Sequence, residues 1–198
     1  MTTRRAARRL WILPILALLS LSARLATAGD EATKSVSPPE VATLAGGCFW
    51  GMEDILRTIP GVIGTRVGYT GGFTPHPTYA DVHAGTTGHA EAVEVTFDPH
   101  VLSFEALLGY FFRMHDPTTL NRQGNDVGTS YRSAIFYHDE SQRQTAERVK
   151  AAVAASGKWK NPIVTEIVPA GEFTPAEEEH QKYLMKHPGG YTCHYLRD

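Results

Sequence analysis

Apolar and polar residues change their spacing repeatedly between residue 41 and the C-terminal part of the chain. Short apolar runs and runs with period-two alternation predict five strands, at residues 42–46, 62–69, 90–97, 132–137 and 164–168. Longer segments with apolar positions three and four residues apart predict four helices, at residues 48–58, 104–115, 140–155 and 175–186. Ser103 and Thr174 stand where the N-caps of the second and fourth of these helices are expected.

This order of strands and helices indicates helices that pack on a sheet. Within residues 90–97 the two alternating sets are Ala92, Glu94 and Thr96 on one side and Val93, Val95 and Phe97 on the other. A strand with one polar face favours antiparallel pairing within a mixed sheet. We therefore expect an α+β fold, a two-layer α/β sandwich with a mixed, mainly antiparallel sheet, a ferredoxin-like core and long functional loops.

Length and charge narrow the class of protein further. The chain has 198 residues, a formal net charge of −2 and 20% charged residues, which suits a single globular domain. Beyond the N-terminal arginines no basic stripe is present, and there is no recognisable nucleic-acid module, so no nucleic-acid partner is expected.

The N-terminal residues have the pattern of a secretory signal. Four arginines between positions 4 and 9 precede an apolar run at residues 10–21, and Ala26-Thr27-Ala28 offers the small residues that a signal peptidase reads. We expect a signal peptide at residues 1–28, a linker at 29–40 and one catalytic domain at 41–198. The protein is then exported to the periplasm by the general secretory route and keeps no membrane span; an uncleaved anchor is the alternative.

One of the two cysteines lies in the sequence Gly46-Gly47-Cys48-Phe49-Trp50, between a predicted strand and a predicted helix. As the first residue of a helix, Cys48 would have unpaired N–H groups and the positive end of the helix dipole to stabilise its thiolate. The glycines would let a substrate approach the backbone, and Phe49 and Trp50 could wall an apolar pocket beside the sulfur. The alternative is a buried structural cysteine with core aromatics.

The second cysteine, Cys193, lies five residues from the C-terminus, after the glycines of Pro188-Gly189-Gly190. In an exported protein the two thiols can form one disulfide, either as a structural staple or through a mobile tail, and the glycine-containing segment favours the tail. The chain has no zinc-ligand spacing, and His89-Ala90-Glu91 lacks the downstream P-C-x-x-C of a zinc deaminase. We therefore expect no metal and no cofactor.

Two polar loops lead into strands and carry further chemistry. The first, with five glycines and two prolines at residues 68–88, contains Tyr79 and ends before Glu91; the second, at 121–131, contains Asp126 and Tyr131. Long ordered loops on a compact domain are usually functional. Both loops could converge on the helix start at Cys48.

With these residues the chain resembles the peptide methionine sulfoxide reductase A family. Seven separate motifs carry the resemblance in order over residues 41–193: Gly47-Cys48-Phe49-Trp50-Gly51-Met52-Glu53, Gly68-Tyr69-Thr70-Gly71-Gly72, Pro77-Thr78-Tyr79, Gly88-His89-Ala90-Glu91, Phe97-Asp98-Pro99, His115-Asp116-Pro117-Thr118 and residues 124–133. The resemblance implies a monomeric enzyme that reduces the S epimer of methionine sulfoxide, free or in proteins, with electrons from a thioredoxin-like donor.

The resemblance also implies a role for each site residue. Cys48 is the catalytic nucleophile, Phe49 and Trp50 bind the substrate methyl group, Glu91 is the acid, Tyr79 and Tyr131 are hydroxyl donors, Asp126 is a supporting carboxylate and Cys193 is the resolving cysteine. His83 departs from the family, because many members have a cysteine near this position, which leaves Cys193 alone to resolve a sulfenic acid. The chemistry agrees: a sulfoxide oxygen leaves only when protonated, and a dry pocket would raise the pKa of Glu91 for that task.

Two other interpretations fit parts of the sequence. A cysteine hydrolase would use Cys48 with a late histidine such as His180 or His187, although the full papain-like signature is missing. An exported non-enzymatic domain would use Cys48 and Cys193 as a structural disulfide.

Overall fold

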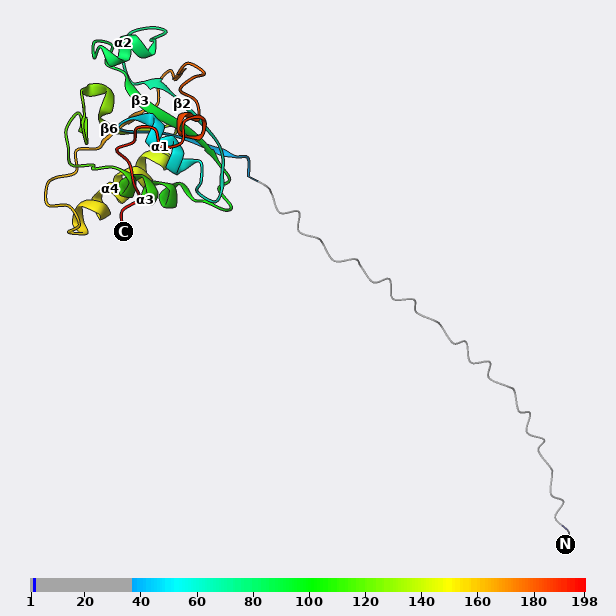
Figure 1. Cartoon of the computed structure of the whole chain (residues 1–198). Helices are drawn as coiled ribbons and strands as arrows, with labels where there is room; N and C mark the ends of the chain where they lie inside the picture. The colour runs from blue at the N-terminus through cyan, green and yellow to red at the C-terminus, as the bar shows by residue number, and fades with distance from the viewer. Residues whose placement is uncertain (1, 3–36) are drawn as a thin grey trace. The chain divides into compact units, whose positions relative to one another are not determined.

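Strands with one apolar face assemble into the sheet that organises this protein (Figure 1). The computed structural model describes residue 2 and residues 37–198. The expected signal peptide and most of the expected linker lie outside the described residues. Within the described part no helix is long and apolar enough to cross a membrane.

The described residues form a six-stranded sheet and a separate short hairpin. The sheet contains β1 (Glu40–Gly46), β2 (Val62–Thr70), β3 (Ala90–Phe97), β6 (Ser133–Tyr137), β7 (Glu166–Pro169) and β8 (Thr174–Pro175), and the hairpin joins β4 (Arg122–Gln123) to β5 (Asp126–Val127). Their order in the sheet is β7-β6-β1-β3-β2-β8, with antiparallel pairs throughout except for the parallel pair β6–β7. The expected mixed, mainly antiparallel sheet is confirmed.

The helices are α1 (Phe49–Leu56), α2 (Tyr79–His83), α3 (Phe104–Met114), α4 (Glu140–Ala155) and α5 (Tyr183–Lys186), with a 3₁₀ turn η1 (Thr129–Tyr131). The chain order β1-α1-β2-β3-α3-β6 with the strand order β6-β1-β3-β2 is the ferredoxin-like arrangement. Helix α2 lies at one end of the domain, far from α3 and α4 in Figure 1.

Period-two alternation divides the sheet into two faces. Val93, Val95 and Phe97 of β3 belong to the main core, where residues of α1 and α3 also pack, whereas Ala90 and Ala92 belong to a smaller cluster on the opposite face. Because alternate residues of a strand share a face, Glu91 lies on the same face as Val93. The strand therefore turns an acidic residue toward the main core.

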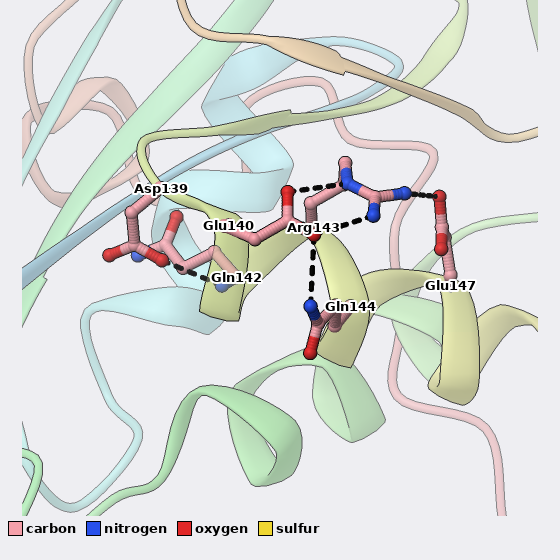
Figure 2. A network of polar contacts seen from close by, with 6 residues as sticks. All are labelled: Asp139, Glu140, Gln142, Arg143, Gln144 and Glu147. Carbon is pink, nitrogen blue, oxygen red and sulfur yellow. Dashed lines mark hydrogen bonds and ion pairs between the residues drawn. The ribbon is translucent and has the colours of Figure 1, made fainter.

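Helix α4 begins with a side-chain cap and a run of polar residues. Figure 2 shows that Asp139 caps its first turn, accepting from the Gln142 N–H at 2.8 Å, and that Arg143 pairs with Glu140 at 2.6 Å and with Glu147. These exposed pairs contribute little stability. The Gln142 side chain instead reaches the sheet, where its Nε2 donates to the Val41 carbonyl at 2.7 Å.

The predicted helix at residues 175–186 is wrong over most of its length. Thr174, expected as an N-cap, pairs in β8 with Tyr69 of β2, and only Tyr183–Lys186 is helical. Gln181 explains the difference, because its side-chain amide accepts from the Val67 N–H and donates to the Val67 carbonyl, both at 2.9 Å. The segment thus completes the edge of β2 instead of forming a helix.

The long loop between β2 and β3 is held by a buried arginine from the chain segment before β6. The Arg132 guanidinium donates to the carbonyls of Gly71 (3.3 Å), Gly88 (3.1 Å) and Thr129 (3.0 Å). A planar guanidinium can satisfy several carbonyls at fixed angles. Both ends of this loop are therefore tied to η1.

Candidate active site

The strand register brings the end of β1 beside the start of β3. Leu44 pairs with Val93, so the residues that follow β1 lie next to Glu91, the second residue of β3. Cys48 occupies the N-cap position of α1, one residue before the helix begins. The expected position of this cysteine at a helix start is confirmed.

The first two N–H groups of α1 lie beside the carboxyl and the thiol. The Phe49 N–H donates to Glu91 Oε2 at 3.0 Å, and the Trp50 N–H faces the Cys48 sulfur. Such N–H groups have no partner inside the helix and favour negative charge. One helix start therefore supports both reactive groups.

Burial controls the charge of Glu91. Its side chain is 2% exposed, and this burial, opposed by the Phe49 N–H and assisted by the charge of Asp126, raises its pKa to about 8. Glu91 is therefore protonated at neutral pH. The structure brings it to Cys48, and its ionised form raises the pKa of the thiol.

The expected stabilisation of the Cys48 thiolate does not prevail in the resting protein. Burial raises the pKa of Cys48 above its usual range, the Glu91 charge raises it further, and the Trp50 N–H only partly opposes these effects. A thiolate loses more hydration energy in this buried position than one helix N–H returns. The resting cysteine is a protonated thiol.

Two tyrosine hydroxyls belong to the same electrostatic cluster. Burial, followed by the charge of Glu91, raises the pKa of both Tyr79 and Tyr131, so both keep their protons as donors. Tyr79 is the first residue of α2, and its backbone N–H donates to Glu177 Oε1 at 2.8 Å. Glu177 in turn accepts from the Tyr69 hydroxyl at 2.9 Å, which links α2 to β2.

The two aromatics that follow Cys48 lie in different environments. The Phe49 ring is fully buried against Tyr69 and His180, with centroid distances of 5.9 Å and 5.7 Å. Trp50 is partly exposed, and its indole stacks on Tyr183 at 3.8 Å. Trp50 therefore forms the solvent side of this aromatic cluster, and Phe49 forms its base.

The C-terminal segment packs directly on the helix start. Cys193 lies with its sulfur 3.5 Å from Asp126 Oδ2, and the Tyr191 hydroxyl donates to Asp126 Oδ1 at 3.0 Å. Burial, followed by the charge of Asp126, raises the pKa of Cys193 to about 11, while the Cys48 N–H opposes this. Asp126 thus holds the segment that carries the second thiol, and both thiols are free.

The glycines around Cys48 make room for protein side chains, not for a substrate. A Cβ on Gly47 would lie 2.6 Å from the Gln123 side chain, and one on Gly51 would lie 2.7 Å from His194 Nδ1 and against Thr192. The substrate role expected for the glycine pair is therefore wrong, because Gln123 and His194 fill the space beside Gly47, and His115 and Phe111 fill the space beside Gly46. Gly47 also has a φ of +108°, which other residues rarely adopt.

The end of the tail is held beside α3. The Arg197 N–H donates to the Arg113 carbonyl at 2.9 Å, and Lys158 Nζ donates to the Asp198 carbonyl at 2.9 Å. The Arg197 guanidinium lies over the Trp159 ring at 5.6 Å. Cys193 is thus fixed from both directions along the chain.

Several residues of this site were not predicted. They hold the loops, the aromatic rings or the tail in place through contacts with residues far away in sequence: Arg132, Glu177, Tyr183 and His194. Tyr183 and Glu177 belong to the segment expected as a plain helix, so its helical pattern concealed them. The adjacent Cys193-His194 pair was visible, but only the fold shows that His194 is buried.

The hydrolase interpretation finds no support in the geometry. His180 Nδ1 accepts from the Trp50 indole at 3.2 Å, and His187 is exposed beside Tyr183. Among the described residues, no hydrogen bond connects Cys48 to either imidazole.

The ferredoxin-like fold, the paired thiols and the protonated carboxyl beside them define a thiol-dependent oxidoreductase. Residues 40–198 match the family described as peptide methionine sulfoxide reductase. The peptide methionine sulfoxide reductase MsrA of Nocardia farcinica is 60% identical over 156 residues, which cover 79% of this chain and 89% of the relative.

Two solved structures of one yeast protein agree with this comparison. The crystal structure of reduced Mxr1 from Saccharomyces cerevisiae matches with a TM-score of 0.77 at 39% identity, over 83% of this chain and 98% of Mxr1. The structure of Mxr1 in complex with Trx2 matches with a TM-score of 0.56 at 28% identity, over 83% of this chain and 97% of that chain. The chain therefore belongs to the peptide methionine sulfoxide reductases of the MsrA type.

The raised pKa of Glu91 predicts a pH-dependent stability. The folded pKa of about 8 exceeds the ordinary value, so the folded state binds the proton more tightly and wild-type stability falls as pH rises toward 8. Glu91→Gln keeps an acceptor for the Phe49 N–H and removes the buried charge. We expect the variant to equal wild type near pH 4 and to exceed it by on the order of a few kcal/mol above pH 8. Urea unfolding at both pH values checks this; a pH-independent difference would contradict it.

Because the tail packs on α1, adding one methyl group at Gly51 should change the reactivity of Cys193. Gly51→Ala should favour the helix by about 1 kcal/mol but displace Thr192 and His194, so Cys193 becomes more reactive toward iodoacetamide. Gly109→Ala is the matched control, because a Cβ on this glycine of α3 meets open space. Peptide mass mapping of alkylated Cys193 measures the rate. Equal rates in the two variants would show that the tail does not depend on Gly51.

Proposed function

We propose that Cys48 attacks the sulfur of methionine sulfoxide while Glu91 protonates the sulfoxide oxygen. The observation that carries the proposal is the shared helix start, where the Phe49 N–H binds the Glu91 carboxyl and the Trp50 N–H faces the Cys48 sulfur. A carboxylic acid beside a thiol supplies the proton that this poor leaving oxygen needs.

The protonation states of the resting site suit this reaction. Glu91, with a pKa of about 8, is an acid at neutral pH and loses this ability above that value. Protonated Glu91 carries no negative charge and does not repel a Cys48 thiolate. The proton on Glu91 therefore serves as the acid and also makes ionisation of Cys48 easier. Tyr79 and Tyr131 keep their hydroxyl protons and can donate to the oxygen as negative charge develops on it.

The aromatic cluster provides an apolar wall for the methyl group of the substrate. Trp50 has exposed surface, as do Tyr183 and Tyr79, which flank it at 3.8 Å and 6.5 Å between ring centroids. Aromatic rings also make favourable contacts with sulfur. The fully buried Phe49 supports this wall from below.

The second half of the cycle uses Cys193. Transfer of oxygen oxidises Cys48 to a sulfenic acid and reduces the sulfoxide to methionine, a two-electron exchange. The Cys193 sulfur then forms a disulfide with Cys48 and water is released. A thioredoxin-type dithiol reduces the disulfide by exchange, which the complex of the yeast relative with Trx2 supports.

We also propose that the protein works after export, in the periplasm. The arginines before the apolar run at residues 10–21 and the Ala26-Thr27-Ala28 segment support a cleaved secretory signal. The thioredoxin-like donor must then lie outside the cytosol.

Counting thiols tests the catalytic proposal. Reduced protein, freed of reductant and mixed with free methionine sulfoxide, should release one methionine per chain and lose both thiols, and a peptide map should show a Cys48–Cys193 disulfide. Cys193→Ser should release the same methionine but stall when thioredoxin is the donor, because its sulfenic acid has no partner. Survival of both thiols in the wild-type protein would refute the proposal.

The mass of the protein after export tests its location. Expression of the full chain in a Gram-negative host should yield a periplasmic species that begins at Gly29, identified by intact mass and N-terminal sequencing. Arg4 and Arg5 replaced by Glu should reduce its yield in the periplasm. A full-length cytoplasmic product would contradict export.

A further inference from the structure

The Cys193 thiol has two acceptors within reach and only one proton. Its sulfur lies 3.5 Å from Asp126 Oδ2 and 3.5 Å from His194 Nδ1. Asp126 already accepts from the Tyr191 hydroxyl on its other oxygen. The imidazole of His194 has no role in the reaction proposed above.

The hydrogen bonds of the His194 ring determine its tautomer. His194 Nε2 lies 2.9 Å from the Gly46 carbonyl, which can only accept, so Nε2 carries the hydrogen. Nδ1 then has a free lone pair, and it points to the thiol. Burial lowers the pKa of His194, which keeps the ring neutral.

The position of the ring is fixed by packing. His194 is 7% exposed and lies in the space left by Gly47 and Gly51, where a Cβ would approach its Cε1 to 3.2 Å and its Nδ1 to 2.7 Å. The ring therefore holds one orientation relative to α1. Such a fixed acceptor loses little entropy when it takes a proton.

We propose that His194 is the general base of the resolving step, a catalytic role that rests on the function proposed above. Nδ1 takes the proton of the Cys193 thiol as that sulfur attacks the Cys48 sulfur of the sulfenic acid. The sulfur–sulfur bond forms, the sulfur–oxygen bond of Cys48 breaks, and the leaving hydroxide takes the proton from the imidazolium to become water. The Cys193 sulfur supplies the electron pair of the new bond and is oxidised from the thiol to the disulfide level. The Cys48 sulfur is reduced from the sulfenic to the disulfide level, and His194 returns to its neutral form.

The step needs a base because the thiol holds its proton firmly. With a pKa of about 11, about one Cys193 in 10⁴ is ionised at pH 7. Loss of this proton to Asp126 leaves a neutral acid, and loss to His194 leaves a cation beside the new thiolate. That cation lies close to the Asp126 carboxylate as well as to the thiolate, and the negative charge of Asp126 favours the protonated ring.

Other charged and titratable groups also act on His194. Asp126 favours its protonated form, and the Arg197 cation disfavours it. The neighbouring His115 is fully buried and, with a pKa of about 3, remains neutral across the range of interest. The acid limb of the reaction therefore belongs to His194, and it lies below about pH 6.5.

Separate measurement of the two half-reactions tests the proposal. Reduced wild type and His194→Gln are mixed with excess free methionine sulfoxide in a rapid-quench instrument from about pH 5.5 to about pH 9. Released methionine reports the first step, and disulfide in the alkylated protein, with dimedone adducts of Cys48, reports the second. His100→Gln, an exposed histidine far from both thiols in sequence, is the matched control.

We expect equal methionine release in all three proteins and disulfide formation about 10²-fold slower in His194→Gln at neutral pH. The wild-type rate should be level near neutral pH and fall as the pH drops through the His194 pKa, because only the neutral ring accepts a proton. In His194→Gln the rate should instead rise about tenfold per pH unit, as hydroxide ionises the thiol. Dimedone adducts should accumulate in this variant alone.

Other results would overturn the proposal. An unchanged, level disulfide rate in His194→Gln would assign the proton to Asp126, and a parallel loss of methionine release would show a structural role. If the variant does not fold, a wild-type disulfide rate that rises about tenfold per pH unit through neutral pH refutes the proposal by itself, because it shows that hydroxide and not the imidazole takes the proton. Failure of wild type to release methionine would instead refute the function proposed above.

Discussion

The hydrogen bond from the Phe49 N–H to Glu91, 3.0 Å long, is the contact on which the rest of the site depends. It joins the first turn of α1 to the start of β3 and places an acid next to the Cys48 thiol at the N-cap of α1. The antiparallel register of β1 and β3 makes the contact possible, because it brings these two strand ends together. The fold thus determines the position of the chemistry before any loop contributes.

Burial gives these groups their protonation states, and it acts on each in the same direction. It keeps the proton on Glu91, on both cysteines and on the tyrosine hydroxyls, so the resting site holds little charge. A site of this kind is compatible with a packed core, since isolated charges in a core are expensive. The protonated groups are also the ones that a sulfoxide oxygen requires.

The repeating strand and helix patterns were sufficient to predict most of the fold, and α4 begins and ends at the predicted residues. They failed at residues 175–186, because the bonds between Gln181 and Val67 lie outside any local pattern. In the site, the motif identified Cys48, Glu91 and both tyrosines. The burial of Glu91 was also visible in principle, since it shares a face with Val93 and Val95. The direction in which the pKa of Cys48 shifts was not predictable. It depends on the loss of solvent around the sulfur, which is caused by segments distant in sequence, including the C-terminal tail.

The anchoring of the tail beside α3 has a consequence for the entropy of the reaction. Cys48 and Cys193 stand near opposite ends of the domain in sequence, and closing so long a loop in an unfolded chain is unfavourable. In the folded protein the contacts of Arg197, Asp198 and His194 have already closed it. The two sulfurs therefore meet at a high effective concentration, and the cost of bringing them together is met by folding and not by each catalytic cycle.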